Sequence, residues 1–323
     1  MNLHQQALQW AKQYLIEQEQ SRILSDTKIV ETAYSIVYKI ETTKQTVYLK
    51  QVPQALFLEP DTLLFLHQQS CKNIPEILAI HRTLRCFIMS ASGDISLRHS
   101  FKELIHFDQL AQGIEHYTTI QRALENKTEQ LSSLGLPDWR LNRFPSLFQQ
   151  LLQQHALLVS DGLTEQEMTQ LHNLHSVCAQ HCDFLSKYVI PETINHCDFQ
   201  ENNMLLDKKT GGISIIDWGE TVVTHPFFSL NSCLWNLTYF HKLKPSDALY
   251  HRLKVKCVEP WLPLYEEKTL LTIFNTSNEL LGIYAALTYQ RMYAATINQS
   301  QTVQQQHLGS IAGCLRTFLK DNK

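Results

Sequence analysis

The chain has 323 residues, of which 44% are apolar, and it carries a formal net charge of −3 at pH 7. This length is sufficient for one large domain or two lobes with a substantial core, and the near-neutral charge excludes the basic footprint of a nucleic-acid-binding protein. No apolar run approaches the length of a membrane span, and the first residues lack the apolar segment of a signal peptide. We therefore expect a soluble, cytoplasmic protein, monomeric or weakly dimeric, with neither nucleic acid nor membrane as a partner.

Cysteine and glycine usage narrows the chemistry further. The eight cysteines are scattered and form no compact framework, which is typical of reduced thiols in the cytosol. The sequence contains neither a G-x-x-x-x-G-K-S/T motif nor a G-x-G-x-x-G motif. If a nucleotide binds, its phosphates must therefore be held by something other than a P-loop or a Rossmann turn.

The first ninety residues combine helical and strand-like patterns. Apolar residues at helical spacing predict a helix at residues 3–19. β-Branched and aromatic runs on either side of a polar turn predict an antiparallel hairpin at 32–40 and 46–52. Two further strands are predicted at 73–80 and 86–89.

From residue 97 onward the pattern becomes helical almost to the end of the chain, because apolar residues recur every three or four positions. Helices are predicted at 101–111, 114–134, 144–159, 165–182, 230–239, 248–255, 270–296 and 303–319. A small mixed part followed by a mainly helical part predicts an α+β protein.

The stretch 196–220 interrupts this helical pattern. Two short apolar runs flank a glycine-containing connection, which predicts a β-hairpin. A hairpin brings its two ends together, so Asn203, just before the first strand, and Asp217, just after the second, should meet in space. Asp198 lies five positions before Asn203 on the same incoming loop.

Two carboxylates and a carboxamide at one end of a hairpin form a set of hard oxygen ligands, which suits Mg²⁺. The order H-x-D-x-x-x-x-N, followed by D-x-G, is the layout of a kinase catalytic loop and its metal-binding aspartate. In that layout the first aspartate receives or orients the proton of the substrate hydroxyl. We therefore predict Asp198 as the catalytic residue, with Asn203 and Asp217 as the metal ligands.

Three segments around this hairpin resemble the aminoglycoside phosphotransferase and choline kinase family. They are IPETINHCD at 190–198, NNMLLD at 202–207 and IIDWGE at 215–220. Trp218, where protein kinases carry phenylalanine, favours the small-molecule branch, and Cys197 departs from the family's usual glycine and adds bulk next to Asp198. The resemblance implies a bilobal protein-kinase-like fold, with a β-rich N-lobe at 1–92 and a mainly helical C-lobe at 93–323 that holds the catalytic loop and the acceptor site.

The resemblance also implies how the phosphates of a nucleotide are held. In this family the second strand of the N-terminal hairpin carries a phosphate-binding lysine, and Lys50 occupies that position. Glu59, on the following helix, is then the candidate to pair with Lys50. The alternative is that Glu59 is merely a first-turn acid that complements a helix dipole, with Pro60 at the first helical position.

Three further residues are implied by the same resemblance. Met89 and Ser90 fall at the hinge between the lobes, where backbone groups contact the base. Ser35 stands where the family has its phosphate-binding loop, although no glycine is present there. Ser35 either contacts a phosphate through its hydroxyl or amide, or simply begins a strand.

A second group of residues has a spacing that suggests zinc. His172, His175, Cys178 and Cys182 would share one face of a helix. One helix cannot place four ligands tetrahedrally around one ion, and Leu171, Leu174 and Val177 interleave them as packing residues, so we do not expect a metal here.

The residues and the resemblance together predict a phosphotransferase that uses ATP or GTP and Mg²⁺ and moves the γ-phosphoryl group to a hydroxyl of a small molecule. The acceptor would be aminoglycoside-, choline- or sugar-like, and the sequence leaves its identity open. The alternative is a catalytically silent kinase fold that binds a nucleotide or a partner, which the glycine-free phosphate loop favours.

Overall fold

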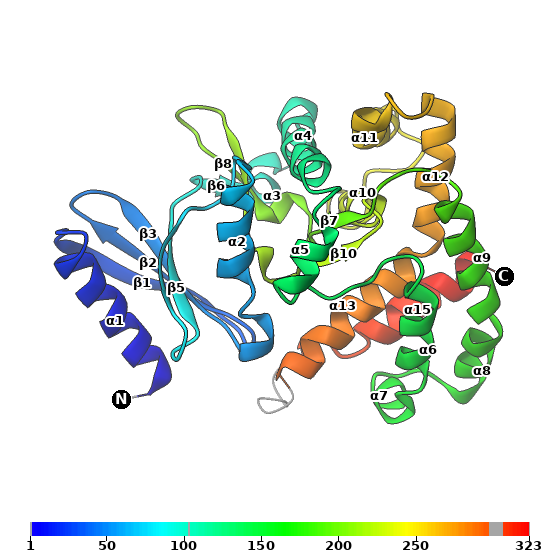
Figure 1. Ribbon diagram of the computed structural model, residues 1–323, viewed down its shortest axis with the longest axis horizontal. Coiled ribbons are helices and arrows are strands. Elements are labelled where there is room, and N and C mark those ends of the chain that lie inside the picture. The colour runs from blue at the N-terminus through cyan, green and yellow to red at the C-terminus, as the bar shows by residue number, and fades with distance from the viewer. Residues whose placement is uncertain (1, 103, 297–305, 323) are drawn as a thin grey trace.

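The computed structural model describes residues 2–102, 104–296 and 306–322. Its elements fall into a small part built on an antiparallel sheet and a larger helical part (Figure 1). The two termini lie at opposite ends of the molecule (Figure 1). This arrangement confirms the expected α+β fold with a small sheet-bearing lobe and a large helical lobe.

Five antiparallel strands form the sheet of the small lobe, in the order β1-β2-β3-β5-β4. They are β1 (Ile23–Glu31), β2 (Ile36–Thr42), β3 (Thr46–Gln51), β4 (Ile77–His81) and β5 (Cys86–Ser90). The predicted hairpin corresponds to β2 and β3. Its turn is closed by Thr42, whose backbone N–H donates to the carbonyl of Gln45 at 3.0 Å, while its hydroxyl accepts from the Gln45 N–H at 3.0 Å.

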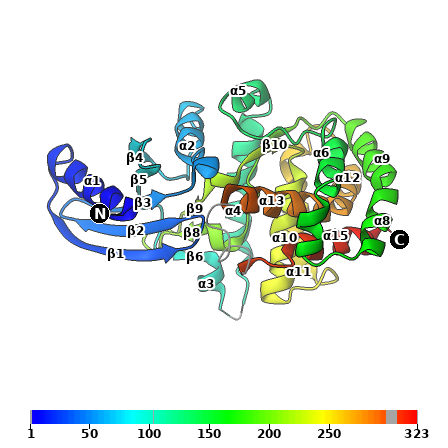
Figure 2. The same ribbon diagram turned by 90° about the horizontal axis from the view of Figure 1, so that it is seen from below.

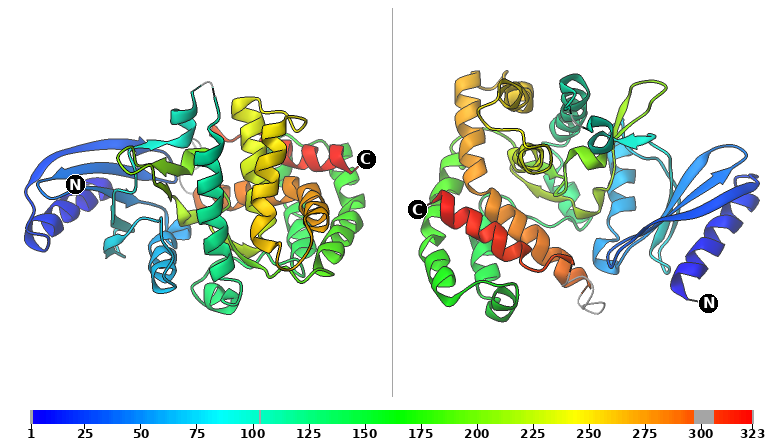
Figure 3. Two further views of the ribbon diagram at one scale, coloured as in Figure 1. Left: turned by 90° about the horizontal axis from the view of Figure 1, so that it is seen from above. Right: turned by 180° about the vertical axis from the view of Figure 1, so that it is seen from behind.

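Two helices cover the two faces of this sheet (Figures 1 and 3). Helix α1 (Leu3–Glu17) buries Ala7, Ala11 and Leu15 in a cluster with the apolar side chains of β2 and β3. Helix α2 (Glu59–Gln68) lies on the opposite face, toward the helical lobe. The sheet is therefore covered on both sides, and α2 lies on the side that faces the helical lobe (Figure 1).

The sequence pattern does not predict β1. All of its residues after Ile23 are exposed, because β1 is the edge strand of the sheet. With neither face buried there is no alternation of apolar and polar residues to detect.

The helical lobe contains twelve helices in the described part of the chain. They are α3 (Leu97–Phe101), α4 (Phe107–Ala123), α5 (Thr128–Ser133), α6 (Phe144–Leu152), α7 (His155–Ser160), α8 (Glu165–Asn173), α9 (His175–Ser186), α10 (Phe227–His241), α11 (Ala248–Val258), α12 (Glu267–Glu279), α13 (Leu281–Thr296) and α15 (Ser310–Asp321).

Five of the predicted helices are wrong in extent, because each covers parts of two helices that are separated by a short break. The predictions at 101–111, 114–134, 144–159, 165–182 and 270–296 run across such breaks. The apolar spacing continues through each break and so conceals it. Of the last predicted helix, residues 303–305 lie outside the described residues, and α15 begins at Ser310.

Helices α13 and α15 lie side by side along one flank of this lobe (Figures 2 and 3). Gly282 permits their close approach, since a Cβ atom there would lie 2.5 Å from the carbonyl oxygen of Cys314. Both helices contribute residues to the wall of the cavity described below.

The predicted catalytic hairpin is confirmed. Strands β8 (Met204–Leu206) and β9 (Ile213–Ile215) pair antiparallel, and β6 (Ile95–Ser96) extends them to three strands. The two ends meet, because the Ile216 N–H donates to the Asn203 carbonyl at 3.0 Å. A separate antiparallel pair is formed by β7 (Thr193–Asn195), which precedes the loop that leads into the hairpin, and β10 (Val222–Thr224), which follows the hairpin.

Every helix among the described residues is too short or too polar to cross a membrane.

Candidate active site

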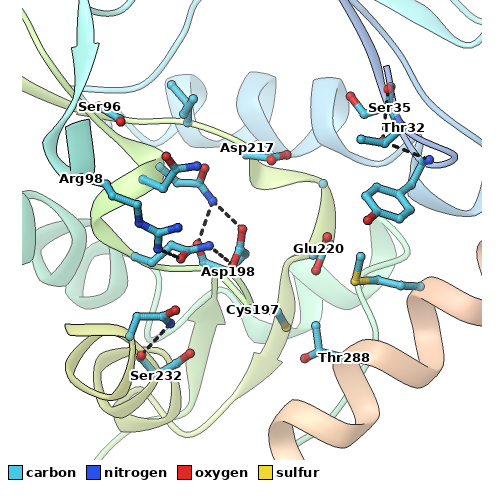
Figure 4. Close-up of a pocket in the computed structure, with 18 of the residues that line it drawn as sticks. Thr32, Ser35, Ser96, Arg98, Cys197, Asp198, Asp217, Glu220, Ser232 and Thr288 are labelled. Carbon is cyan, nitrogen blue, oxygen red and sulfur yellow. Dashed lines mark hydrogen bonds between the residues drawn. The ribbon is translucent and has the colours of Figure 1, made fainter. Parts of the chain in front are cut away.

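Asp198 lies on the loop between β7 and β8, on the wall of a cavity of about 1010 Å³. The Asn203 side-chain nitrogen donates to Asp198 Oδ2 at 2.7 Å and to the Asp198 carbonyl at 2.9 Å, and the Gln200 side-chain nitrogen donates to Oδ1 (Figure 4). Burial and the nearby charge of Asp217 raise the pKa of Asp198 to about 6. The carboxylate is therefore held in one orientation, with a pKa close to the range that a general base requires.

His196 joins this loop to the strand that leads to Asp217. Its buried ring donates from Nε2 to the Ile216 carbonyl at 2.8 Å and accepts at Nδ1 from the Asp198 N–H at 3.2 Å. Burial lowers the pKa of His196, which keeps the ring neutral and able to play both roles. His196 thus fixes the loop that carries Asp198.

Lys50 on β3 connects the sheet to the hairpin. Its Nζ lies 2.5 Å from Glu59 Oε2 and 2.5 Å from Asp217 Oδ1. Burial opposes its charge, but the two carboxylates outweigh burial and raise the pKa of Lys50 well above its ordinary value. The ammonium is therefore positively charged and fixed at the point where the two lobes meet.

Glu59 is the first residue of α2 and is fully buried. Besides Lys50, its carboxylate accepts from the Trp218 N–H at 3.2 Å. Burial raises the pKa of Glu59, while the charge of Lys50 acts in the opposite direction. A solvated first-turn acid would have neither contact, so the structure places Glu59 in the ion-pair arrangement and not in the simpler alternative.

Asp217 adopts a left-handed backbone with φ of 68°, a conformation that aspartate tolerates better than most residues. Its side chain is 46% exposed and points into the cavity (Figure 4). Partial desolvation in the cavity favours a higher pKa, but the adjacent Lys50 lowers the pKa of Asp217 below its ordinary value. The carboxylate is therefore ionised.

Asn203 and Asp217 fit the ligand set that Mg²⁺ prefers. Within the described residues no hydrogen bond engages Asn203 Oδ1 or Asp217 Oδ2, so both oxygens can coordinate. The same part of the chain holds no group of three or more His, Cys, Asp and Glu side chains suited to a metal. The protein thus offers two hard ligands and leaves the others to phosphates and water, as is usual for Mg²⁺ in nucleotide sites.

Ser35, Met89 and Ser90 line the same cavity. The Ser35 N–H donates to the Thr32 hydroxyl at 3.0 Å, so the Ser35 hydroxyl is the group that remains for a phosphate. The Ser90 N–H is already bonded to the Glu76 carbonyl at 2.9 Å. A base held at this edge of the sheet must therefore use other backbone groups, and Ser92 and Gly93 line the cavity just beyond.

Four residues that the sequence analysis missed form a network behind Asp198. Arg98 donates from Nε to Glu201 at 2.7 Å and from its terminal nitrogen to the Gln200 carboxamide oxygen, and His241 lies 3.1 Å from the same Glu201 oxygen. Glu201 is fully buried, and its Oε2 has no partner among the described residues. In the sequence, the only local sign of this network is that two polar residues, Gln200 and Glu201, lie between Asp198 and Asn203.

Glu220 is a further carboxylate that the sequence analysis did not assign to the site. Its side chain points into the cavity between Asp217 and Cys197 (Figure 4). Burial, followed by the charges of Asp198 and Asp217, raises the pKa of Glu220 to about 8.

The residues considered for zinc do not lie on one helix. Helix α8 ends at Asn173 and α9 begins at His175, so His172 belongs to a different helix from the other three. Cys178 and Cys182 are buried. The burial of these two cysteines agrees with packing, whereas His172 is exposed.

A known protein family resembles this chain in sequence, and solved structures resemble it in fold. A model of the phosphotransferase enzyme family matches residues 28–252. A search of curated proteins returns no significant match.

Solved structures share the fold at low sequence identity. Choline kinase from Streptococcus pneumoniae is similar with a TM-score of 0.64 and 11% identity, covering 97% of this chain and 99% of that one. Ethanolamine kinase from Plasmodium vivax is similar with a TM-score of 0.61 and 14% identity, covering 92% of this chain and 84% of that one. An ADP-bound aminoglycoside phosphotransferase is similar with a TM-score of 0.57 and 17% identity, covering 96% of this chain and 97% of that one.

Proposed function

Because the chain belongs to the phosphotransferase enzyme family, we propose that it transfers the γ-phosphoryl group of ATP or GTP to a hydroxyl of a small molecule, with Mg²⁺ as cofactor. The observation that carries the proposal is the contact of Lys50 with both Glu59 and Asp217, on the wall of the cavity that also holds Asp198. A lysine fixed by a helix glutamate beside a metal-binding aspartate is the arrangement on which phosphoryl transfer in kinases depends.

Each residue has a defined task in this proposal. Asp198 orients the acceptor hydroxyl and takes its proton, while Lys50 contacts the phosphates and Glu59 holds the ammonium in place. Asn203 and Asp217 would hold Mg²⁺, which, when bound, neutralises the charge on the phosphate oxygens. Ser35 faces the phosphates, and Met89 and Ser90 line the side of the base.

The test measures the release of ADP or GDP by the purified chain with amino alcohols, sugars and aminoglycosides as acceptors. We expect turnover with Mg²⁺ and none with a chelator. Asp198→Asn should reduce turnover by about a hundredfold or more while nucleotide binding survives, because the carboxamide keeps the shape and cannot take a proton. Equal turnover in this variant would refute the role of Asp198.

One observation favours a second candidate function, a catalytically silent nucleotide-binding module. The loop at 32–35 turns its amides inward, since the N–H groups of Tyr34 and Ser35 both donate to the Thr32 hydroxyl. A silent module would bind nucleotide but release no product with any acceptor, and Asp198→Asn would then change nothing that the assay measures.

A further inference from the structure

An exposed aromatic surface on α10 continues the wall of the cavity that holds Asp198. Trp235, Tyr239 and Phe240 are 47%, 56% and 46% exposed, and all three line the cavity. The rings of Trp235 and Tyr239 stack at 5.3 Å and 10°, and Phe240 meets Tyr239 edge-on at 4.9 Å. We call these three residues the aromatic platform. Grouped, exposed aromatic rings beside a catalytic cavity indicate a binding surface.

Two cations flank the aromatic platform. The Arg98 guanidinium carbon lies 3.6 Å from the ring centroid of Phe240, and Lys242 Nζ lies 5.3 Å from that of Tyr239. These side chains occupy the positions from which the rings would attract a cationic ligand. A positively charged ligand on the platform would therefore meet like charge.

The cavity wall on this side also lacks carboxylates. Among the described residues that follow Thr221, none of those lining the cavity is aspartate or glutamate. An acceptor with several ammonium groups needs a partner for each of them once it is desolvated. Of the carboxylates elsewhere on the cavity wall that have no assigned task, Glu220 lies beside Asp217 (Figure 4) and Asp94 precedes β6, and together they could serve two ammonium groups at most.

We propose that the aromatic platform binds the acceptor, and that this acceptor is an alcohol carrying a planar ring that is uncharged or anionic. The inference rests on the proposed phosphotransferase function and names its substrate class. The ring stacks on Trp235, its hydroxyl points toward Asp198, and an anionic substituent lies beside Arg98. Gln200, Ser232 and Asn236 line the cavity as well and supply hydrogen bonds to the acceptor.

A binding experiment tests this without requiring turnover. Trp235 is the most exposed of the tryptophans, so a ring stacked on it should change the protein's fluorescence. The probes are 4-(hydroxymethyl)benzoate and 4-(aminomethyl)benzyl alcohol, which share a ring and a hydroxyl and differ in charge, together with kanamycin as a polyamine. We expect the benzoate to bind several-fold more tightly than either cationic probe.

Two matched variants locate the binding, which is measured for them by isothermal titration calorimetry because Trp235→Leu lacks the reporting fluorophore. Trp235→Leu should weaken binding of the benzoate about three- to tenfold, the range expected for one aromatic contact. Trp10→Leu is the control, because Trp10 packs on His81 at 5.2 Å in the small lobe and does not line the cavity. Binding to this control should match the wild type, and since Trp235 is on the surface its replacement should leave folding intact.

The outcomes separate this inference from the proposed function. Probe binding that depends on Trp235 in a protein without turnover supports the platform and refutes the enzyme. The inference is overturned if no ring probe binds, if kanamycin binds more tightly than the benzoate, or if Trp235→Leu leaves probe binding unchanged. A variant that instead converts a dimer to a monomer would assign the platform to a second copy of the chain, which also overturns the inference.

Discussion

The side chain of Gln200 joins Arg98 to Asp198. Its carboxamide nitrogen donates to Asp198 Oδ1, and its carboxamide oxygen accepts from the Arg98 guanidinium. Because Arg98 can only donate, it determines which end of the carboxamide faces Asp198. Buried Glu201 anchors Arg98 at 2.7 Å, so the orientation of the Asp198 carboxylate depends on a residue in α3, far away in the sequence.

The first prediction concerns this connection. Arg98→Met and Gln200→Met should each lower kcat about tenfold, since small displacements of a catalytic group are costly, and should leave the KM for ATP within about twofold. If Arg98 acts through Gln200, the double variant should be no worse than either single one. The measurement is steady-state kinetics on all four proteins.

Multiplied losses of kcat in the double variant would instead show that Arg98 acts on the chemical step by a route other than Gln200, whereas its proposed contact with the acceptor would appear in the KM for the acceptor. A crystal structure of Arg98→Met gives a second readout, in which the Gln200 carboxamide should turn away from Asp198. Arg82→Met is the control, because Arg82 pairs with Asp61 at the surface and is 64% exposed.

The second prediction concerns the buried charges of Lys50 and Glu59. Lys50→Met leaves the Glu59 carboxylate buried without its cation, which should cost about 3–5 kcal/mol of unfolding free energy. Adding Glu59→Gln to that variant removes the stranded charge and should recover much of the loss, although activity stays absent. Urea unfolding of the single and double variants measures both.

Lys39→Met provides the matched control for that experiment. Lys39 and Glu41 pair on the surface, where they are 39% and 45% exposed. Loss of this exposed pair should leave the unfolding free energy almost unchanged. If Lys50→Met were equally mild, Glu59 would not depend on Lys50 for its charge.

The catalytic hairpin was predictable from the sequence because its determinants are local. Asp198, Asn203 and Asp217 are placed by two short strands and one turn, so their spacing alone indicates that they converge. The contact between Lys50 and Asp217 joins residues that are 167 positions apart, and no periodicity of the sequence indicates it. Lys50 could be proposed only from the resemblance to a known family.

The rest of the site could not be predicted for the same reason. Arg98 reaches Glu201 across 103 positions, and neither residue belongs to a pattern that marks it. The aromatic platform could not be predicted from the sequence for a different reason. At helical spacing Trp235 and Tyr239 resemble core residues, and only the packing of α10 reveals that their rings remain exposed.

The third prediction concerns pH and His225, a fully buried imidazole whose Nε2 has no partner in the described part of the chain. Burial lowers the pKa of His225 to about 3, whereas in the unfolded chain it is about 6.5. Between these values the unfolded state binds more protons, so stability falls as the pH falls below about 6.5. From pH 7.5 to 5.5 this one group should cost about 1.4 kcal/mol.

His225→Phe should remove that part of the pH dependence, because phenylalanine binds no proton and fits among Phe227 and Phe228. The quantity to compare is the difference in unfolding free energy between the two pH values. His251→Phe changes an exposed histidine and should keep the wild-type difference. Identical pH slopes in the wild type and His225→Phe would mean that His225 is protonated in the folded state.

The last prediction concerns Asp161, which holds the start of α15 against the helical lobe. Its Oδ1 accepts from the Gly309 N–H at 2.9 Å and its Oδ2 from the Ala312 N–H at 2.8 Å. Asp161→Asn should therefore destabilise the protein by about 2–3 kcal/mol, since one backbone donor would face an amide N–H. Because these two contacts hold the start of α15, the backbone amides of this helix should also exchange hydrogen faster in the variant. Asp183→Asn, at an exposed site on α9, should change stability by less than about 0.5 kcal/mol, and a loss equal to that of Asp161→Asn would exclude a specific role for Asp161.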